Sequence, residues 1–158
     1  MTISRIYSLI AWFVLLVIFS SCERPEIISE RKVFENQLWN RFEILEFVFD
    51  IEKPDITYDV VLDFEHTEKY YTDHINTNIT FYMPDGSMRS RDYTFKLKND
   101  KLEWLGNAEN KAIIHHLPII LGMKFPEAGN YKMRVESKMT KFNLQNIRAV
   151  GLSIKPSK

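Results

Sequence analysis

The segment that decides the fold reads Tyr58-Asp59-Val60-Val61-Leu62-Asp63-Phe64-Glu65. Its residues Tyr58, Val60, Leu62 and Phe64 occupy every second position, and the positions between and after them are acidic except for Val61. Successive side chains of a strand point to opposite faces, so this alternation is typical of a strand with one buried face. The segment therefore predicts a β-strand whose acidic face meets solvent.

Similar patterns recur along the chain. Alternating or continuously apolar segments lie at Ile75–Met83, Met88–Leu97, Ala112–Leu117, Ile119–Phe125, Tyr131–Lys138 and Ala149–Lys155. Pro84-Asp85-Gly86-Ser87 predicts a hairpin turn, because proline presets one turn dihedral and glycine accepts a positive φ. Pro118 is expected to interrupt the strands on either side of it. About six to eight strands with little helical signal predict an all-β fold, an antiparallel β-sandwich of immunoglobulin-like or jelly-roll-like form.

The segment from Val33 to Ile51 carries two patterns. Its first half has apolar residues at helical spacing and its second half has them at every second position. We expect an irregular or short helical start that leads into a strand near Glu46–Ile51. The residues that carry these patterns are Phe34, Leu38, Phe42 and Leu45 for the helix, and Phe47, Phe49 and Ile51 for the strand.

Gly129-Asn130-Tyr131 enters one of the predicted strands. It resembles the tyrosine corner of immunoglobulin-like sandwiches, in which the tyrosine hydroxyl binds the preceding corner of the chain. A tight turn followed by a core tyrosine explains the same residues equally well.

The N-terminal segment is typical of a secretory signal peptide. Arg5 precedes an uncharged apolar run from Ile6 to Phe19, which as a helix would cover about 21 Å, short of a hydrocarbon core of about 30 Å. Phe19-Ser20-Ser21-Cys22 then resembles the lipobox of bacterial lipoproteins. The alternative is an ordinary Cys22 thiol after a short membrane anchor.

The lipobox resemblance implies three parts: a cleavable signal peptide at residues 1–21, a lipidated tether at 22–32, and the sandwich domain at 33–158. Cys22 would then carry a diacylglycerol on its sulfur and an acyl chain on its amine. Several acyl chains hold a protein firmly at a membrane, because each buried methylene contributes roughly 0.8 kcal/mol.

Composition excludes several classes of protein. Lys+Arg and Asp+Glu both number 21, so the formal net charge is zero, which argues against a dedicated nucleic-acid binder. A single cysteine allows no internal disulfide and no zinc site built from several thiolates.

The histidines match no established ligand motif. His115 and His116 are adjacent on a predicted strand, so their side chains point to opposite faces and cannot readily share a metal. His66 and His74 flank a loop with acidic residues, but a solvated loop is the simpler interpretation. We therefore predict neither a metal site nor a cofactor.

Carboxylates and aromatic residues give two further hypotheses. Asp59, Asp63 and Glu65 share one strand face and could form a glycosidase-type site, although such a face is usually polar surface. Tyr70-Tyr71 in a polar loop could serve as a platform for a sugar, although aromatic residues near strand ends, such as Trp39 and Trp104, more often close a core. No catalytic residue is predicted, and the residues that would bind a ligand stay unknown.

A series of landmarks, taken in order, resembles the GldH gliding-motility lipoproteins. They are the lipoprotein leader, Trp39, Phe47-x-Phe49, Tyr58-Asp59, Met83-Pro84-Asp85-Gly86, Tyr93, Trp104-Leu105-Gly106, Phe125-Pro126-Glu127-Ala128-Gly129-x-Tyr131 and Val150-Gly151-Leu152-x-Ile154. The resemblance implies a non-enzymatic envelope lipoprotein tied to gliding motility and to the secretion of adhesins.

Two main hypotheses of function follow. The first is a structural or assembly component of a motility or secretion apparatus, anchored by lipid at Cys22, most simply in the outer membrane and facing the periplasm, with envelope proteins as partners. The alternative is a carbohydrate-binding envelope lipoprotein. A hydrolase that uses Asp59, Asp63 and Glu65 is a weaker third hypothesis.

Overall fold

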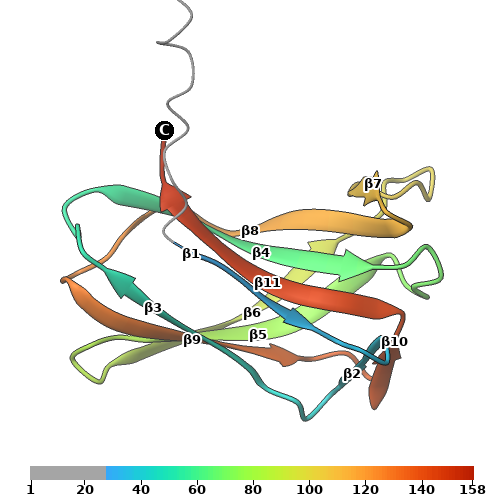
Figure 1. Ribbon diagram of the computed structural model, residues 1–158, viewed down its shortest axis with the longest axis horizontal. Coiled ribbons are helices and arrows are strands. Elements are labelled where there is room, and N and C mark those ends of the chain that lie inside the picture. The colour runs from blue at the N-terminus through green and yellow to red at the C-terminus, as the bar shows by residue number, and fades with distance from the viewer. Residues whose placement is uncertain (1–27) are drawn as a thin grey trace, which may run out of the picture.

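The computed structural model describes residues 28–158, and in this range the chain forms strands and no helix (Figure 1). The strands are β1 (Ile28–Val33), β2 (Leu38–Asn40), β3 (Leu45–Ile51), β4 (Thr57–His66), β5 (His74–Tyr82), β6 (Met88–Lys96), β7 (Asn107–Glu109), β8 (Ala112–Lys124), β9 (Gly129–Ser137), β10 (Asn143–Gln145) and β11 (Ile147–Pro156). The all-β prediction is confirmed.

Two antiparallel sheets pack face to face. One has five strands in the order β1-β11-β4-β8-β7, and the other has four in the order β3-β9-β5-β6; β10 and β2 form a small extra ladder (Figure 1). If the short strands β2, β7 and β10 are set aside, each connection crosses from one sheet to the other except the β5–β6 hairpin. This order is that of a jelly roll, the second of the two predicted forms of sandwich.

The core lies between the two sheets and follows the predicted alternation. In β4, Tyr58, Val60, Leu62 and Phe64 are all buried, and β4 lies in the middle of its sheet between β11 and β8. In the facing sheet, alternate residues of β3, β5 and β9 are buried in the same way. The half-buried strand predicted at residues 58–65 is therefore the centre of the fold.

Residues 33–51 contain no helix, so of the two predicted starts the short helical one is wrong; turns and the short strand β2 precede β3 instead. Phe34, Trp39 and Leu45 are buried, but Leu38 and Phe42 are exposed, so the apparent helical stripe does not form one face. The Trp39 indole Nε1 donates to the Glu43 carbonyl at 3.0 Å and stabilises a turn between β2 and β3. The strand predicted at Glu46–Ile51 is confirmed as β3.

Strand β8 runs through Pro118, where two separate strands were predicted. Pro118 lies opposite Val61, next to register shifts in the β4–β8 pairing. The outer neighbour β7 pairs only with Ala112–Ile114, so this part of β8 is an edge. A proline lacks an N–H donor, and a sheet edge tolerates that loss.

Residues 28–32 belong to the sheet, although the tether was predicted to extend to residue 32. They form β1 with Val33 and pair with β11 from Ile154 to Ala149. Lys32 lies opposite the buried Val150, and its Nζ is 5.6 Å from the centre of the Phe47 ring. A polar strand of this kind is possible at a sheet edge, and its sequence shows no apolar alternation that could reveal it.

Strand β6 is one edge of the four-stranded sheet. Arg89 and Arg91 lie opposite Phe81 and Ile79 of β5, so they share the inner face of the sheet, yet both are exposed. Further along, the half-buried rings of Tyr93 and Phe95 stack with their centres 5.5 Å apart, and the Arg91 guanidinium lies 5.5 Å from the Tyr93 ring.

Tyrosine hydroxyls hold two corners at one end of the sandwich. Tyr131 donates to the Glu127 carbonyl at 2.8 Å, as a tyrosine corner requires, and Tyr58 donates to the Lys53 carbonyl at 2.8 Å. Gly129 has a φ of 148°, and a Cβ there would lie 3.0 Å from Pro84 Cγ, so the corner also needs this glycine.

Replacing Tyr131 by phenylalanine tests the corner. Tyr131→Phe leaves the ring in the core but removes the donor to Glu127, so we expect the free energy of unfolding to fall by about 1 kcal/mol. Urea unfolding of the purified protein measures the change. Tyr93→Phe is the matched control, because the Tyr93 hydroxyl has no hydrogen bond among the described residues; an equal loss in both variants would contradict the assignment.

Candidate functional site

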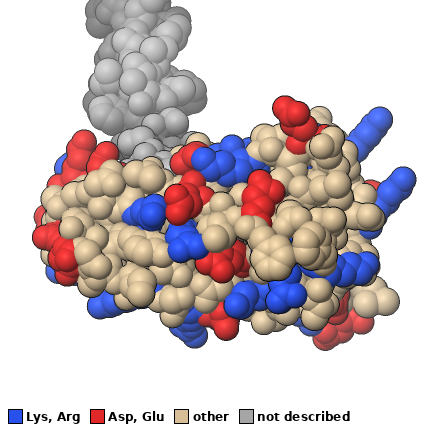
Figure 2. All heavy atoms as spheres, turned by 90° about the horizontal axis from the view of Figure 1, so that it is seen from below, with Lys and Arg blue, Asp and Glu red and all other residues tan. Residues whose placement is uncertain are grey.

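Cys22, the predicted lipidation site, lies outside the described residues, so its modification stays a prediction. Within residues 28–158, no helix is long and apolar enough to cross a membrane. On the face shown in Figure 2, Lys and Arg side chains alternate with Asp and Glu, and no area of a single charge dominates. This agrees with the neutral overall composition.

The three carboxylates of β4 lie on the outer face of the five-stranded sheet, and each one is held by neighbours. Asp59 accepts from the Gly122 N–H at 3.0 Å and the Ser157 hydroxyl at 2.6 Å, and these bonds lower its pKa. Asp63 accepts from Ser153 at 2.5 Å and contacts His116 Nδ1 at 2.6 Å.

Glu65, the third carboxylate, is buried and binds two guanidinium groups. Arg31 of β1 contacts one carboxylate oxygen, and Arg148 Nε lies 3.2 Å from the other. All three acids therefore join neighbouring strands across the sheet. No two of them face each other across a cleft, as the hydrolase hypothesis requires.

His115 and His116 point to opposite faces, as predicted, but His115 has a partner that the sequence did not indicate. His115 is 3% exposed and His66 is fully buried, and their Nε2 atoms lie 3.0 Å apart. His66 Nδ1 lies 2.7 Å from the Thr67 carbonyl, which can only accept, so His66 carries its hydrogen on Nδ1. His115 Nε2 is therefore the donor to His66 Nε2.

Rings surround this histidine pair. The centre of the Trp104 ring lies 4.4 Å from the centre of the His66 ring. The ring centres of Tyr70 and His66 lie 5.0 Å apart. Lys98 Nζ lies 4.0 Å from the Trp104 ring and covers it. Burial is the main cause that lowers the pKa of both histidines. The pKa of His115 falls to about 4, because repulsion from His66 and His116 adds to the effect of burial.

The two histidines that flank the loop at residues 67–73 do not converge on one point. His74 Nδ1 contacts Asp73 at 2.8 Å and Thr72 at 3.1 Å, and His66 points into the core instead. Residues 28–158 contain no group of three or more histidine, cysteine or acidic side chains that could hold a metal ion.

The tyrosine pair of this loop divides between core and surface. Tyr70 is 3% exposed and its hydroxyl donates to the His74 carbonyl at 3.3 Å, whereas Tyr71 is 43% exposed. Lys141 Nζ lies 3.8 Å from the Tyr71 ring and covers part of it. The two rings therefore do not form the open platform on which the carbohydrate hypothesis depended, and Trp39 is buried as expected for a core residue.

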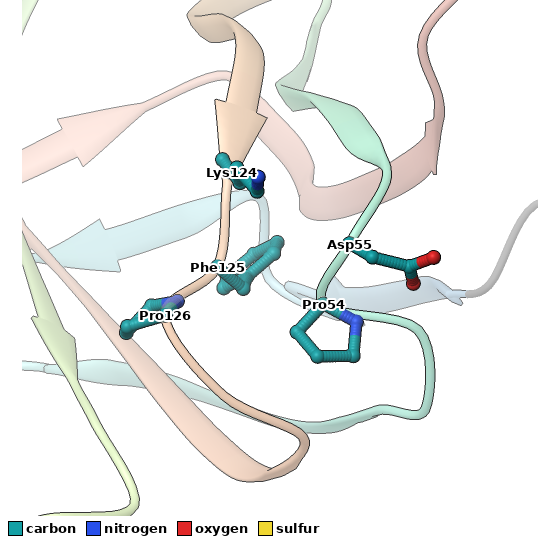
Figure 3. A pocket seen from close by; sticks show the side chains of 5 residues that line it. All are labelled: Pro54, Asp55, Lys124, Phe125 and Pro126. Atoms are coloured by element: carbon teal, nitrogen blue, oxygen red, sulfur yellow. The ribbon is translucent and has the colours of Figure 1, made fainter.

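A shallow hollow lies at the end of the sandwich where the chain turns from β3 to β4 and from β8 to β9. It has a volume of about 430 Å³ and is lined by Pro54, Asp55, Lys124, Phe125 and Pro126 (Figure 3). Its charged lining groups are one carboxylate, Asp55, and one ammonium, Lys124, on separate segments; Phe125 and two prolines complete the lining. Within residues 28–158, Asp55 and Lys124 form no ion pair with each other.

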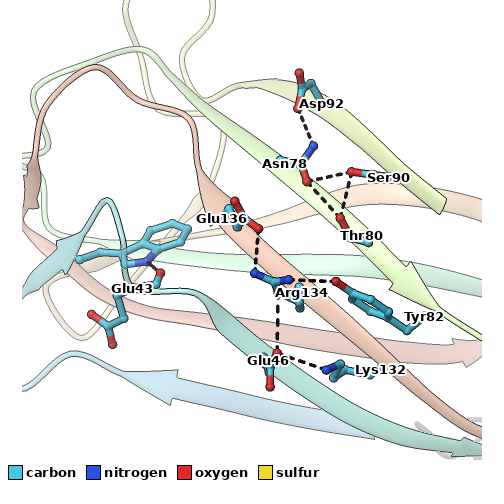
Figure 4. Close-up of polar contacts among 11 residues, drawn as sticks. Glu43, Glu46, Asn78, Thr80, Tyr82, Ser90, Asp92, Lys132, Arg134 and Glu136 are labelled. Atoms are coloured by element: carbon cyan, nitrogen blue, oxygen red, sulfur yellow. Dashed lines mark hydrogen bonds and ion pairs between the residues drawn. The ribbon is translucent and has the colours of Figure 1, made fainter. Parts of the chain in front are cut away.

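The outer face of the four-stranded sheet carries a polar network (Figure 4). Arg134 donates to the Tyr82 hydroxyl at 2.9 Å and to Glu136 at 3.1 Å, and Lys132 donates to Glu46 at 3.3 Å. On β5 and β6, Thr80 donates to Ser90 at 2.9 Å. These groups bind one another across strands, so the face is stable polar surface.

Two aromatic side chains project from the opposite end of the sandwich to the hollow. Phe42, in the turn between β2 and β3, is 71% exposed, and Phe142, just before β10, is 58% exposed. Their ring centres lie 5.3 Å apart in an edge-to-face arrangement. We refer to Phe42 and Phe142 as the aromatic tip. The two residues are about 100 positions apart, and no local sequence pattern indicates that they meet.

Fold and surface together define a jelly-roll domain whose buried and paired titratable groups serve the structure. A family model described as GldH lipoprotein matches residues 26–154, so the chain belongs to the GldH lipoprotein family. The resemblance inferred from the sequence landmarks is confirmed. Membership implies a lipid-anchored protein of the cell envelope with a link to gliding motility.

Two individual proteins illustrate these similarities. The chain is 22% identical to a gliding motility lipoprotein GldH homolog of Christiangramia forsetii, over 96% of each chain. A solved structure, a carbohydrate-binding module specific for non-crystalline cellulose, matches 82% of this chain and 73% of its own with 13% identity and a TM-score of 0.45. A TM-score this low supports no inference about a ligand.

Acid should weaken the fold through His115. An unfolded histidine takes up its proton near pH 6.5, but the native His115 does so only near 4, so the unfolded state binds more protons between these values. We expect the free energy of unfolding to fall as the pH drops from 6.5 to 4, by about 3 kcal/mol from this residue.

Chemical unfolding at a series of pH values measures this dependence, with tryptophan fluorescence as the signal. His115→Gln keeps an N–H donor for His66 but does not titrate, so its unfolding free energy should depend less on pH in this window. His74→Gln, a change at a half-exposed histidine, is the control. Equal pH dependence in the wild type and His115→Gln would refute the role of His115.

Proposed function

We propose that this chain is a non-enzymatic assembly component of a motility or secretion apparatus, held by lipid at Cys22 in the outer membrane and facing the periplasm. Membership of the GldH lipoprotein family is the observation that carries the proposal. The relative from Christiangramia forsetii is named for gliding motility, and that context is transferred to this chain as part of the proposal.

The described residues support a binding role over a catalytic one. The acids of β4 bind serine, histidine and arginine side chains, and the buried histidines bind each other. In the hollow at the β3–β4 end, Asp55 and Lys124 form no ion pair with each other within residues 28–158. A domain of this kind acts through its surface, by contact with other molecules.

The position of the first strand supports anchoring at one end of the domain. Ile28 pairs with Ile154 near the C-terminus, and it follows Cys22 by six positions. A segment of that length reaches at most about 20 Å. A lipid on Cys22 would therefore hold the start of β1 close to the bilayer surface.

Replacing Cys22 tests the anchor. Cys22→Ser removes the sulfur that would carry the diacylglycerol, so we expect an unprocessed precursor without acyl chains. Mass spectrometry of the N-terminal peptide and membrane fractionation measure the outcome. Ser21→Ala is the matched control, since it keeps a small residue before the cysteine; a cleaved and acylated Cys22→Ser protein would refute the assignment.

Deletion of the gene tests the role in motility or secretion. We expect reduced colony spreading and reduced amounts of secreted protein, both restored by the wild-type chain but not by Cys22→Ser. Normal spreading and normal secretion in the deletion strain would rule out this function.

A further inference from the structure

The aromatic tip is a pair of exposed rings on a hydrogen-bonded support. Phe42 and Phe142 leave 71% and 58% of their surfaces in contact with solvent. Apolar surface gains roughly 25 cal/mol for each Å² removed from water, so exposed rings of this size are unfavourable in isolation. Protein interfaces often use such aromatic side chains as anchors.

The backbone beneath the rings is fixed by several hydrogen bonds. The Phe42 N–H donates to the Asn40 side-chain oxygen at 2.9 Å, and the Glu43 N–H donates to the Asn40 carbonyl at 2.9 Å. The Arg41 N–H donates to the Phe142 carbonyl at 2.8 Å, which joins the two segments.

Buried residues stabilise the β2–β10 pairing beneath the aromatic tip. Trp39 and Leu144 lie opposite each other in the β2–β10 pairing, and both are fully buried. The side chain of Asn40 also donates to that of Asn143 at 3.0 Å. The tip therefore loses little conformational freedom on binding, which favours affinity.

Positive charge flanks the rings. Arg41 precedes Phe42 and Lys141 precedes Phe142, and neither forms an ion pair within residues 28–158. Lys141 instead covers Tyr71, whose ring is partly exposed beside it. Glu43 lies in the same turn, so the tip keeps a net positive charge.

We propose that the aromatic tip docks into an apolar pocket with an acidic rim on another protein of the cell envelope. The inference rests on the proposed function, because a lipid on Cys22 would fix the opposite end of the domain. The tip follows the end of β1 and precedes the start of β11, and the ten residues of β11 span about 30 Å back to the anchored end (Figure 1). The rings would thus face away from the anchoring bilayer.

Photocrosslinking of the full chain in its own cells identifies the occupant. We would place p-benzoylphenylalanine at Phe142 and, in a separate strain, at Met88, which is 65% exposed near the β5–β6 hairpin at the other end of the sandwich. We expect one envelope protein to crosslink from position 142 and not from position 88, at a peptide that contains apolar and acidic residues.

Binding of the purified partner then tests the residues. Phe42→Ala and Phe142→Ala should each weaken the affinity at least about tenfold, as for anchor residues of an interface. Lys141→Glu should also weaken it, and added salt should reduce the affinity of the wild type. Met88→Ala is the matched control with unchanged affinity, and equal melting temperatures show that all variants are folded.

Four outcomes would overturn the proposal: no crosslink at 142, a crosslink to lipid, a crosslink to a second copy of this chain, or an affinity unchanged by both alanine variants. Failure of the proposed function is a separate result. If the deletion strain spreads and secretes normally, the assembly role is wrong. If the deletion strain is defective but the tip variants bind the partner as the wild type does, only the docking site is wrong.

Discussion

Burial of the inner face of β4 is the constraint on which the rest of the structure depends. Two clusters of rings pack at its ends. Tyr58 packs against Phe125, which also meets Phe49 and Tyr131, and at the other end Phe64 contacts both His66 and Tyr70. Because β4 pairs along most of its length with β11 and β8, any change in its register would move these rings out of both clusters at once.

The outer surface of the same strand explains why a chain rich in carboxylates does not present an obvious catalytic site. Its acids alternate with the core residues, and β11, β8 and β1 supply the serine, histidine and arginine groups that bind them. The three acids of β4, which suggested a catalytic site from the sequence, thus link neighbouring strands through hydrogen bonds and ion pairs. The aromatic tip, by contrast, lies at one end of the sandwich, in two side chains outside the strands.

Local periodicity predicted the fold well, but contacts between distant segments could not be predicted from it. The alternation at residues 58–65 indicated β4 because one strand carries the whole pattern. His66 and His115 meet across the β4–β8 pairing, 49 positions apart, and only the three-dimensional register brings them together. Strand β1 was not predicted because an edge strand needs no alternating apolar face. The exposed Phe42 suggested a helix because it lies at helical spacing from the buried residues Phe34 and Leu45.

The two arginines on the inner side of β6 have a consequence for how copies of this protein meet. An open strand edge can pair with the same edge of another molecule, and inward-facing charges prevent this because they would be buried without partners. Proteins held on a membrane surface diffuse in two dimensions and collide often. Arg89 and Arg91 would therefore keep a crowded layer of these domains from fusing into continuous sheets, so that association stays under the control of specific surfaces.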